Sequence, residues 1–580
     1  MTTDKTEPSE VKKIPNDVIK RPLKKPLITG GIIAVIAIAS IIGGTVLLGG
    51  IDEIEGDTLV IGVTGPITTI DPLESWWSGT VSWMIPQIVT EGLFAVEFIN
   101  NSSRIIPNLS TGYNWSVNKT ELTCYLRENV EFHDGTPFNA TAVKWNIDRL
   151  HRLLDTVGSD YAYIWQLPDG NWIINETKIL DEFIVKFVLN QPFVPLPSVL
   201  TTPSSLMVSP SSTPDNEYIN GTIPGTLSGT GAFIYSAYEE DDYATLLFNP
   251  DYWGGRPAFD NVIIKFYPND TVRYEAMLSG ELSMTFWSDR DEDLLINTTG
   301  IELEKYLFPG MDYIYINNNL INTTMRKAIS YAFNFSAYAN LDLMNKPVSP
   351  IRCESPITKG MPFSHWGSFD APYYNISIAR QALKDANWPG TEGLTVNDNI
   401  TAGNEWEVVA NSSTPLATYN YTWPTGFSED YLYYLLNENL KQIGVKFEQT
   451  PGLSFAELFF ICNDLYGYTR NMLGLSRFWW SVDYYDPVSM LHPLFSNKAD
   501  GFKNAGQVND SLVQQWMEDA LEETNETVRD QLYFKIEERL IEEIYPVIWL
   551  SSNVAYHVHV SNLHWTPDLG IFTIKDWYFD

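Results

Sequence analysis

The segment LRENVEFHDGTPFNATAVKWNIDRL, Leu126–Leu150, predicts the end of a strand, a reversal of the chain and the start of a helix. Leu122–Leu126 favours a strand, and the dipeptide Asp134-Gly135 lets the chain turn back. Asn139 is a good helix N-cap. The apolar residues that follow recur on one helix face: Val143, Ile147 and Leu150.

Strand and helix patterns alternate along the rest of the chain. The predicted strands are Asp57–Val63, Phe183–Leu189, Tyr243–Phe248, Val262–Phe266 and Tyr313–Ile316. The predicted helices are Val81–Leu93 with a break near Pro86, Thr271–Leu278, Met325–Phe333, Ala379–Ala386, Tyr431–Ile443, Leu512–Glu522 and Val528–Ile544. We find no repeat of fixed period, so the pattern indicates a mixed α/β fold. A chain of 580 residues is too long for one core and predicts three or four compact units.

Composition excludes some classes of function. The net charge of −35 argues against nucleic-acid binding, because that binding needs clustered lysine and arginine to displace counterions from phosphates. The three cysteines, Cys124, Cys353 and Cys462, form no CxxC pair, which argues against a disulfide scaffold or a zinc module. One bridge with one free thiol stays open, and the sequence does not choose the pair.

Residues Pro26–Ile51 are uncharged and predict a membrane anchor. As a helix they would span about 39 Å, more than the ~30 Å hydrocarbon layer of a bilayer. Lysines and an arginine precede this segment and acidic residues follow it, so residues 1–25 are expected in the cytoplasm and 52–580 outside the cell. A cleaved signal peptide is the alternative, although the apolar segment is long for one and no small-residue cleavage site closes it.

The glycosylation triplet Asn-x-Ser/Thr occurs 18 times, all after the predicted anchor. Chance placement of the 42 asparagines predicts about 6 such triplets. The excess favours a glycosylated outer surface, although loops rich in Asn, Ser and Thr also produce these triplets incidentally.

Several segments, in order along the chain, resemble family 5 extracellular solute-binding proteins, the oligopeptide, dipeptide and nickel receptors of ABC importers. Leu126–Phe138 is similar to the family's LRxxVxFHDGxPF segment, and Ala142 and Ser283 depart from its pattern at positions where the family often has acidic residues. The other similar segments are Ile70-Asp71-Pro72, Glu91–Phe94, Gly229–Phe233, Asn249–Trp253, Met325–Ala332 and Trp480–Pro487.

The resemblance implies a two-lobed, type II periplasmic-binding-protein-like ectodomain with three subdomains, which captures a solute and passes it to ABC permease subunits. Lobe I is expected in three parts, 57–105, 222–310 and 509–580, with an inserted subdomain at 106–221 and lobe II at 311–508. An anchor helix in place of a lipid, together with the glycosylation triplets, suggests an archaeal cell surface.

The resemblance also implies a binding site for the ligand. In peptide-binding members the aspartate that corresponds to Asp483 pairs with the ligand's α-ammonium, and a carboxylate in a closed cleft suits that role. A structural turn before Pro487 is the alternative for Asp483, and Asp486 is expected to be structural. Further expected contacts are Trp76, Trp480, Tyr484, Tyr315 and Asn317, and every aromatic residue among them could instead belong to the core.

No cofactor or metal is expected, and we find no HExxH, GxSxG or Walker motif. His133 is interpreted as a turn residue, and His557 with His559 as a buried pair on one strand face rather than as a metal site. Two other functions stay open. One is a surface hydrolase with paired carboxylates, and the other is a surface sensor or binding protein that works without a transporter.

Overall fold

The computed structural model describes residues 58–67, 69–74, 80–99, 102–156, 162–167, 170–286, 298–341, 350–423, 430–450, 452–462, 472–498, 504–566 and 574–580. Within it, Glu55–Asp580 form one compact unit. The predicted anchor lies outside the described residues. Among those described, no helix has the length and apolar character that a membrane crossing requires.

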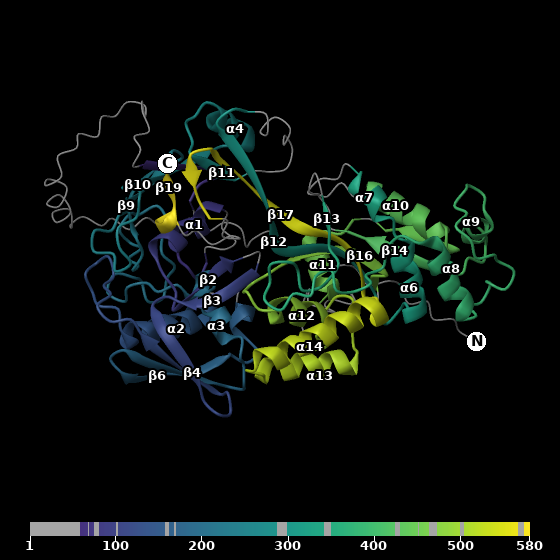
Figure 1. The fold of residues 1–580 in the computed structure, drawn as a ribbon, viewed down its shortest axis with the longest axis horizontal. Helices are drawn as coiled ribbons and strands as arrows, with labels where there is room; N and C mark the ends of the chain where they lie inside the picture. The colour runs from purple at the N-terminus through teal and green to yellow at the C-terminus, as the bar shows by residue number, and fades with distance from the viewer. Residues whose placement is uncertain are drawn as a thin grey trace, which may run out of the picture. The chain divides into compact units, whose positions relative to one another are not determined.

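A large mixed sheet runs through this unit in the order β15-β14-β16-β12-β17-β11-β1-β10-β9-β8, and β13 pairs with β17 beside it (Figure 1). Its strands are β1 (Thr58–Thr64), β8 (Phe233–Glu239), β9 (Tyr243–Phe248), β10 (Asn261–Tyr267), β11 (Met284–Phe286), β12 (Ile301–Ile316), β13 (Ile351–Arg352), β14 (Ala417–Thr422), β15 (Val445–Gln449), β16 (Leu475–Ser481) and β17 (Val547–Val560).

The two longest strands, β12 and β17, join the halves of this sheet. One end of β12 pairs with β16 over Gly310–Ile316, and the far end of β17 pairs with β11 over His557–His559. Strands β12 and β17 pair with each other along almost their whole length, from Ile301 opposite Val560 to Tyr315 opposite Val547, with irregularities at Phe308/Met311 and Asp312/Tyr313. Of these two strands, only the Tyr313–Ile316 part of β12 and the strand face of His557 and His559 in β17 were predicted.

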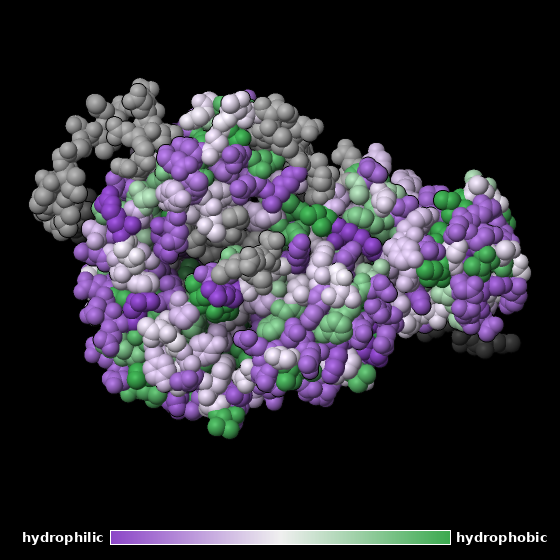
Figure 2. All heavy atoms as spheres, viewed as in Figure 1, coloured by the Kyte–Doolittle hydropathy of each residue, from purple (hydrophilic) through white to green (hydrophobic). Residues whose placement is uncertain are grey.

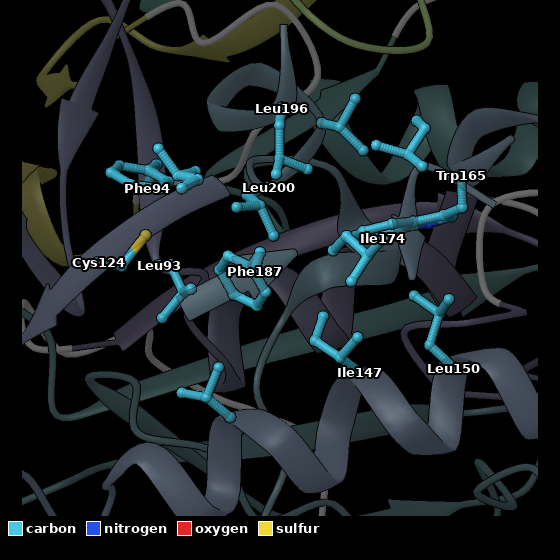
Figure 3. Packing of buried hydrophobic residues seen from close by; sticks show 14 of the residues in the cluster. Leu93, Phe94, Cys124, Ile147, Leu150, Trp165, Ile174, Phe187, Leu196 and Leu200 are labelled. Carbon is cyan, nitrogen blue, oxygen red and sulfur yellow. The ribbon is translucent and has the colours of Figure 1, made fainter. Parts of the chain in front are cut away.

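A second, four-stranded sheet has the order β4-β5-β7-β6, and its strand β5 leads toward the Asp134-Gly135 turn. Its strands are β4 (Ser110–Trp115), β5 (Glu121–Leu126), β6 (Ile174–Asp181) and β7 (Ile184–Leu189). Helix α2 (Ala140–Thr156) covers it, and Asn139 accepts hydrogen bonds from Thr141 N and Ala142 N as the predicted N-cap. Val143, Ile147 and Leu150 are buried in the core between helix and sheet, together with Phe187 and Trp165 (Figure 3).

The other strands form two pairs, β2 (Phe94–Ile99) with β3 (Ser102–Pro107) and β18 (Leu563–His564) with β19 (Tyr578–Phe579). The other α-helices are α1 (Thr80–Val89), α3 (Leu196–Val199), α4 (Asp270–Leu278), α6 (Thr323–Ala332), α7 (Phe335–Ala339), α8 (Ile376–Asp385), α9 (Glu405–Ala410), α10 (Asp430–Lys441), α11 (Phe455–Cys462), α12 (Val488–Phe495), α13 (Ser511–Glu522) and α14 (Glu526–Glu538).

Two features of the helices differ from prediction. Helix α1 runs through Pro86 without a break and ends at Val89. Pro86 has no N–H to donate within the helix, but its carbonyl oxygen accepts a hydrogen bond from Thr90 N at 2.8 Å. Helix α14 ends at Glu538, and a π-helical turn over Arg539–Ile544 continues it.

Helices α13 and α14 pack with segments assigned to lobe II. Val513, Met517 and Ile536 share a core with Met311 and Leu491. Residues 509–580 were expected in lobe I, but these two helices of that segment share their core with residues expected in lobe II. The end of the same segment differs, because Leu563 and Trp577 belong to the core of β1 and β10.

All three cysteines are buried as thiols, and none is joined in a disulfide bridge. Cys124 lies in the core of the four-stranded sheet, and Cys353 and Cys462 lie in the core that holds α13 and α14. Hydrophilic residues cover much of the face seen in Figure 2, as expected for a net charge of −35.

Candidate functional site

A cavity of about 550 Å³ opens among the described residues. Volumes of about 300–1,000 Å³ are typical of sites for small ligands. Segments far apart in the sequence line it: the end of α1, strand β2, the loops 201–206 and 231–233, residues 482–485 and residues 574–576. Four carboxylates and one ammonium group are in this lining: Glu91, Glu97, Asp483, Asp576 and Lys575.

Glu91 joins three of the sequence motifs at the wall of the cavity. Its carboxylate accepts hydrogen bonds from Thr230 Oγ1 at 2.8 Å, Tyr252 Oη at 2.9 Å and Trp253 Nε1 at 2.7 Å. Burial raises the pKa of Glu91, and these hydrogen bonds oppose that rise. A buried carboxylate with three donors holds the segments around it in one arrangement.

The glycines of the Gly229–Phe233 loop let it pass against the end of α1. A Cβ atom on Gly231 would lie 2.7 Å from Val89 O, and one on Gly229 would lie 2.2 Å from the same oxygen. His133 secures the loop from the other side, since its Nε2 lies 2.9 Å from Gly231 O and its Nδ1 accepts from Gly229 N at 3.4 Å. His133 lies in the predicted turn and also joins two of the motifs, the segment Leu126–Phe138 and the loop Gly229–Phe233.

Asp483 lies half-buried in the lining of the same cavity, between two buried residues, Val482 and Tyr484. Its Oδ1 accepts a hydrogen bond from Tyr163 Oη at 2.6 Å, which joins it to the part of the chain that carries the four-stranded sheet. Asp483 and Tyr484 also line a smaller cavity of about 140 Å³ on their other side.

Residues 104–502 match the family of bacterial extracellular solute-binding proteins, family 5. The chain belongs to this family. It is therefore a binding receptor rather than an enzyme, which goes against the hydrolase alternative.

Known proteins resemble this family 5 protein over nearly its whole length. The glutathione-binding protein GsiB of Escherichia coli K12 is 25% identical over 540 residues, covering 89% of this chain and 94% of that protein. DppA of Helicobacter pylori, an ABC transporter-associated periplasmic binding protein solved with the peptide STSA, aligns with a TM-score of 0.63 at 19% identity, covering 90% and 98% of the two chains. HbpA2 of Haemophilus parasuis aligns with a TM-score of 0.73 at 18% identity, covering 90% and 100%. Both structures share the mixed α/β, periplasmic-binding-protein-like fold.

The structure brings two of the predicted contacts of this family 5 protein together at the cavity, Asp483 and Tyr484. Three others lie away from its lining. Trp480 donates from Nε1 to Ser489 O at 3.0 Å, and Tyr315 is buried against Tyr313 and Phe478. Asn317 is buried and donates to Leu473 O at 2.8 Å. Trp76 lies outside the described residues.

Asp486 has the structural surroundings that the sequence suggested. Arg529 Nη1 donates to Asp486 Oδ2 at 2.7 Å and Nη2 donates to Oδ1 at 2.9 Å, and both side chains are buried. Asp71 forms a similar buried pair with Arg149. The Asp486 pair fixes the turn between the cavity-lining residues 482–485 and α12, and the Asp71 pair joins the turn after Asp71 to α2.

Glu91, Glu97 and Asp576 line the cavity but were not predicted as site residues. Glu91 begins the segment Glu91–Phe94, which resembles the family, and it is the single acidic residue between Glu74 and Glu97. A lone acidic residue in a mostly apolar stretch is a signal of a buried carboxylate that needs partners. Glu97 and Asp576 carry no such signal, because they reach the cavity only through the packing of a strand pair and the C-terminal segment.

Proposed function

We propose that this family 5 protein captures extracellular peptides in the 550 Å³ cavity and that Asp483 pairs with the peptide's α-ammonium. The observation that carries the proposal is the position of Asp483 in the lining, which holds three further carboxylates and a single lysine. Such a surrounding favours a cationic group, and an ammonium–carboxylate hydrogen bond in a partly dry site is strong and selective. Relatives named for glutathione and peptide binding agree with this ligand class.

Capture would occur between two lobes joined by β12 and β17. The proposed division has lobe I at 57–105, 222–310 and 509–580, the inserted subdomain at 106–221 and lobe II at 311–508, with α13 and α14 packed on lobe II residues. A ligand that touches both lobes stabilises the closed arrangement, so closure is a shift of population. Contacts of this kind already span the proposed lobes: Tyr163 with Asp483 and Phe98 with Tyr485.

The test is the affinity of the full-length protein for short peptides with a free or an acetylated N-terminus, measured by calorimetry. We expect Asp483→Asn to weaken binding of free peptides at least tenfold, because a charged hydrogen bond is lost. The control Asp385→Asn changes an exposed carboxylate on α8 and should bind as the unmodified protein does. Equal binding of acetylated and free peptides to the unmodified protein would rule out the ammonium role of Asp483.

We also propose that residues 26–51 anchor the protein, with the N-terminus in the cytoplasm and the ectodomain outside, and that permease subunits receive the ligand. Deletion of the gene should then abolish uptake of a peptide that the protein binds. Unchanged uptake would favour the sensor alternative. Protease added to intact cells should remove the ectodomain and leave a basic, membrane-bound fragment. Glycosylation of some Asn-x-Ser/Thr sites at an archaeal surface is part of the same proposal and would appear as glycopeptides by mass spectrometry.

A further inference from the structure

A group of metal-binding side chains lies on the paired strands β12 and β17, away from the cavity. Glu302 stands directly opposite His559 in the register of this antiparallel pair, and Glu304 stands opposite His557. Opposed residues and residues two apart share one face of a sheet, so Glu302, Glu304 and His559 point to the same side. Their ligand atoms lie within 4.8 Å of one another.

The imidazole of His559 is the observation that points to a ligand. The residue is only 2% exposed, and its Nδ1 lies 2.9 Å from Val560 O. Donation from Nδ1 to this carbonyl leaves the lone pair on Nε2, which has no hydrogen-bond partner among the described residues. Glu304 Oε1 lies 3.8 Å from it. A histidine that ligates a metal typically donates its other ring N–H to a backbone carbonyl in this way.

We propose that Glu302, Glu304 and His559 bind a divalent transition-metal ion of the zinc class. Two carboxylates with one imidazole suit zinc, cobalt or manganese, whereas calcium and magnesium prefer oxygen ligands alone. Tetrahedral zinc at about 2.1 Å from each ligand places the ligands about 3.4 Å apart. Glu302 is exposed and Glu304 half-buried, so their side chains have room to close on the buried imidazole, and water can complete the coordination.

An ion bound to these three residues would connect strands β12 and β17 through their side chains. Glu302 and Glu304 come from β12 and His559 from β17, and both strands continue into the two halves of the large sheet. An ion bound here would link them at the end where β17 also pairs with β11. This role is separate from peptide capture, since none of the three residues lines the cavity.

The experiment titrates zinc chloride into the metal-free, full-length protein and measures heat, with Glu302→Gln, Glu304→Gln and the double variant beside it. We expect one saturable site in the unmodified protein and at least a tenfold loss of affinity in each variant. These positions are exposed or half-buried, so the variants should keep the fold, which circular dichroism checks. The matched control is Glu240→Gln in the exposed turn between β8 and β9.

Cobalt gives a second readout, because coordination by the imidazole and carboxylates produces visible absorption bands that the double variant should lack. The proposal is overturned if the unmodified protein shows no saturable zinc binding, or if the double variant binds zinc and cobalt as the unmodified protein does. Tighter binding of calcium than of zinc would overturn the assigned metal class.

Discussion

At the scale of single residues, two aspartates three positions apart have different surroundings. Asp483 lies half-buried at the cavity with Tyr163 as a donor, and Asp486 is buried with both oxygens bonded to Arg529. We predict that Asp486→Asn destabilises the fold by about 3–5 kcal/mol, because it leaves the Arg529 charge buried without its partner. Asp483→Asn should cost only about 1 kcal/mol. Denaturant unfolding followed by tryptophan fluorescence measures both, and equal loss in the two variants would contradict this assignment.

The sequence could suggest these different roles but not the partners. A residue directly before proline is restricted in its backbone, which favoured a structural Asp486. The partner of Asp483 lies 320 residues away in the chain and that of Asp486 lies 43 away, so no local pattern indicates either. Tyr315 and Asn317 were expected at the end of a strand, and β12 does end at Ile316. Local sequence could not show that neither residue lines the cavity.

At the scale of elements, the loop Gly229–Phe233 depends on close approach to α1. We predict that Gly231→Ala destabilises the protein by about 1–3 kcal/mol and weakens ligand binding, because the new methyl group would meet the carbonyl oxygens of Val89 and Ile88 at 2.7 and 2.8 Å. The control Gly393→Ala adds its Cβ where no atom lies within 4 Å. Thermal unfolding and peptide affinity check both variants. A Gly231→Ala protein as stable as the control would show that the loop can move aside.

Elements with one clear buried face were predictable, and those that depend on distant pairing were not. Helix α2 carries its apolar stripe and its cap in the local sequence. Strand β17 is buried because β12, β11 and β13 pair with it, and its sequence mixes polar residues and histidines with apolar ones. The first half of β12 alternates apolar and charged residues only over Ile301–Glu304, and Pro309-Gly310 then separates it from the part that was predicted.

Helix starts also account for part of the glycosylation signal. Six of the 18 Asn-x-Ser/Thr triplets begin with an asparagine whose side chain caps a helix: Asn139, Asn269, Asn322, Asn334, Asn375 and Asn525. Capping favours asparagine for its own reasons. The remaining 12 triplets are still about twice the chance number.

At the scale of the whole molecule, one ligand should protect segments that are distant in sequence. We predict that peptide binding slows amide hydrogen exchange both in 231–233 and in 482–485, because both line the cavity. Strand β6, which has exposed residues and lies outside the lining, is the internal control. Protection of one segment alone would contradict capture between two lobes.

The chain-wide organisation was predictable only through resemblance. Composition and periodicity indicate a mixed α/β protein, and the ordered motifs indicate the family to which residues 104–502 belong. The contacts between the motifs were not predictable. Thr230 and Trp253, from two of the motifs, both donate hydrogen bonds to the carboxylate of Glu91, which belongs to a third. Contacts of this range depend on the folded topology rather than on local sequence.

The three buried cysteines give the molecule built-in reporters of local unfolding. Burial raises the pKa of the Cys353 thiol to about 12 and raises that of Cys124 as well, so in the native state neither supplies the thiolate that alkylating reagents attack. Labelling therefore requires the surrounding core to open. Cys124 lies on β5 of the four-stranded sheet, and the other two cysteines lie in the core that holds α13 and α14. The labelling rates of the unmodified chain therefore report local opening of these two regions separately.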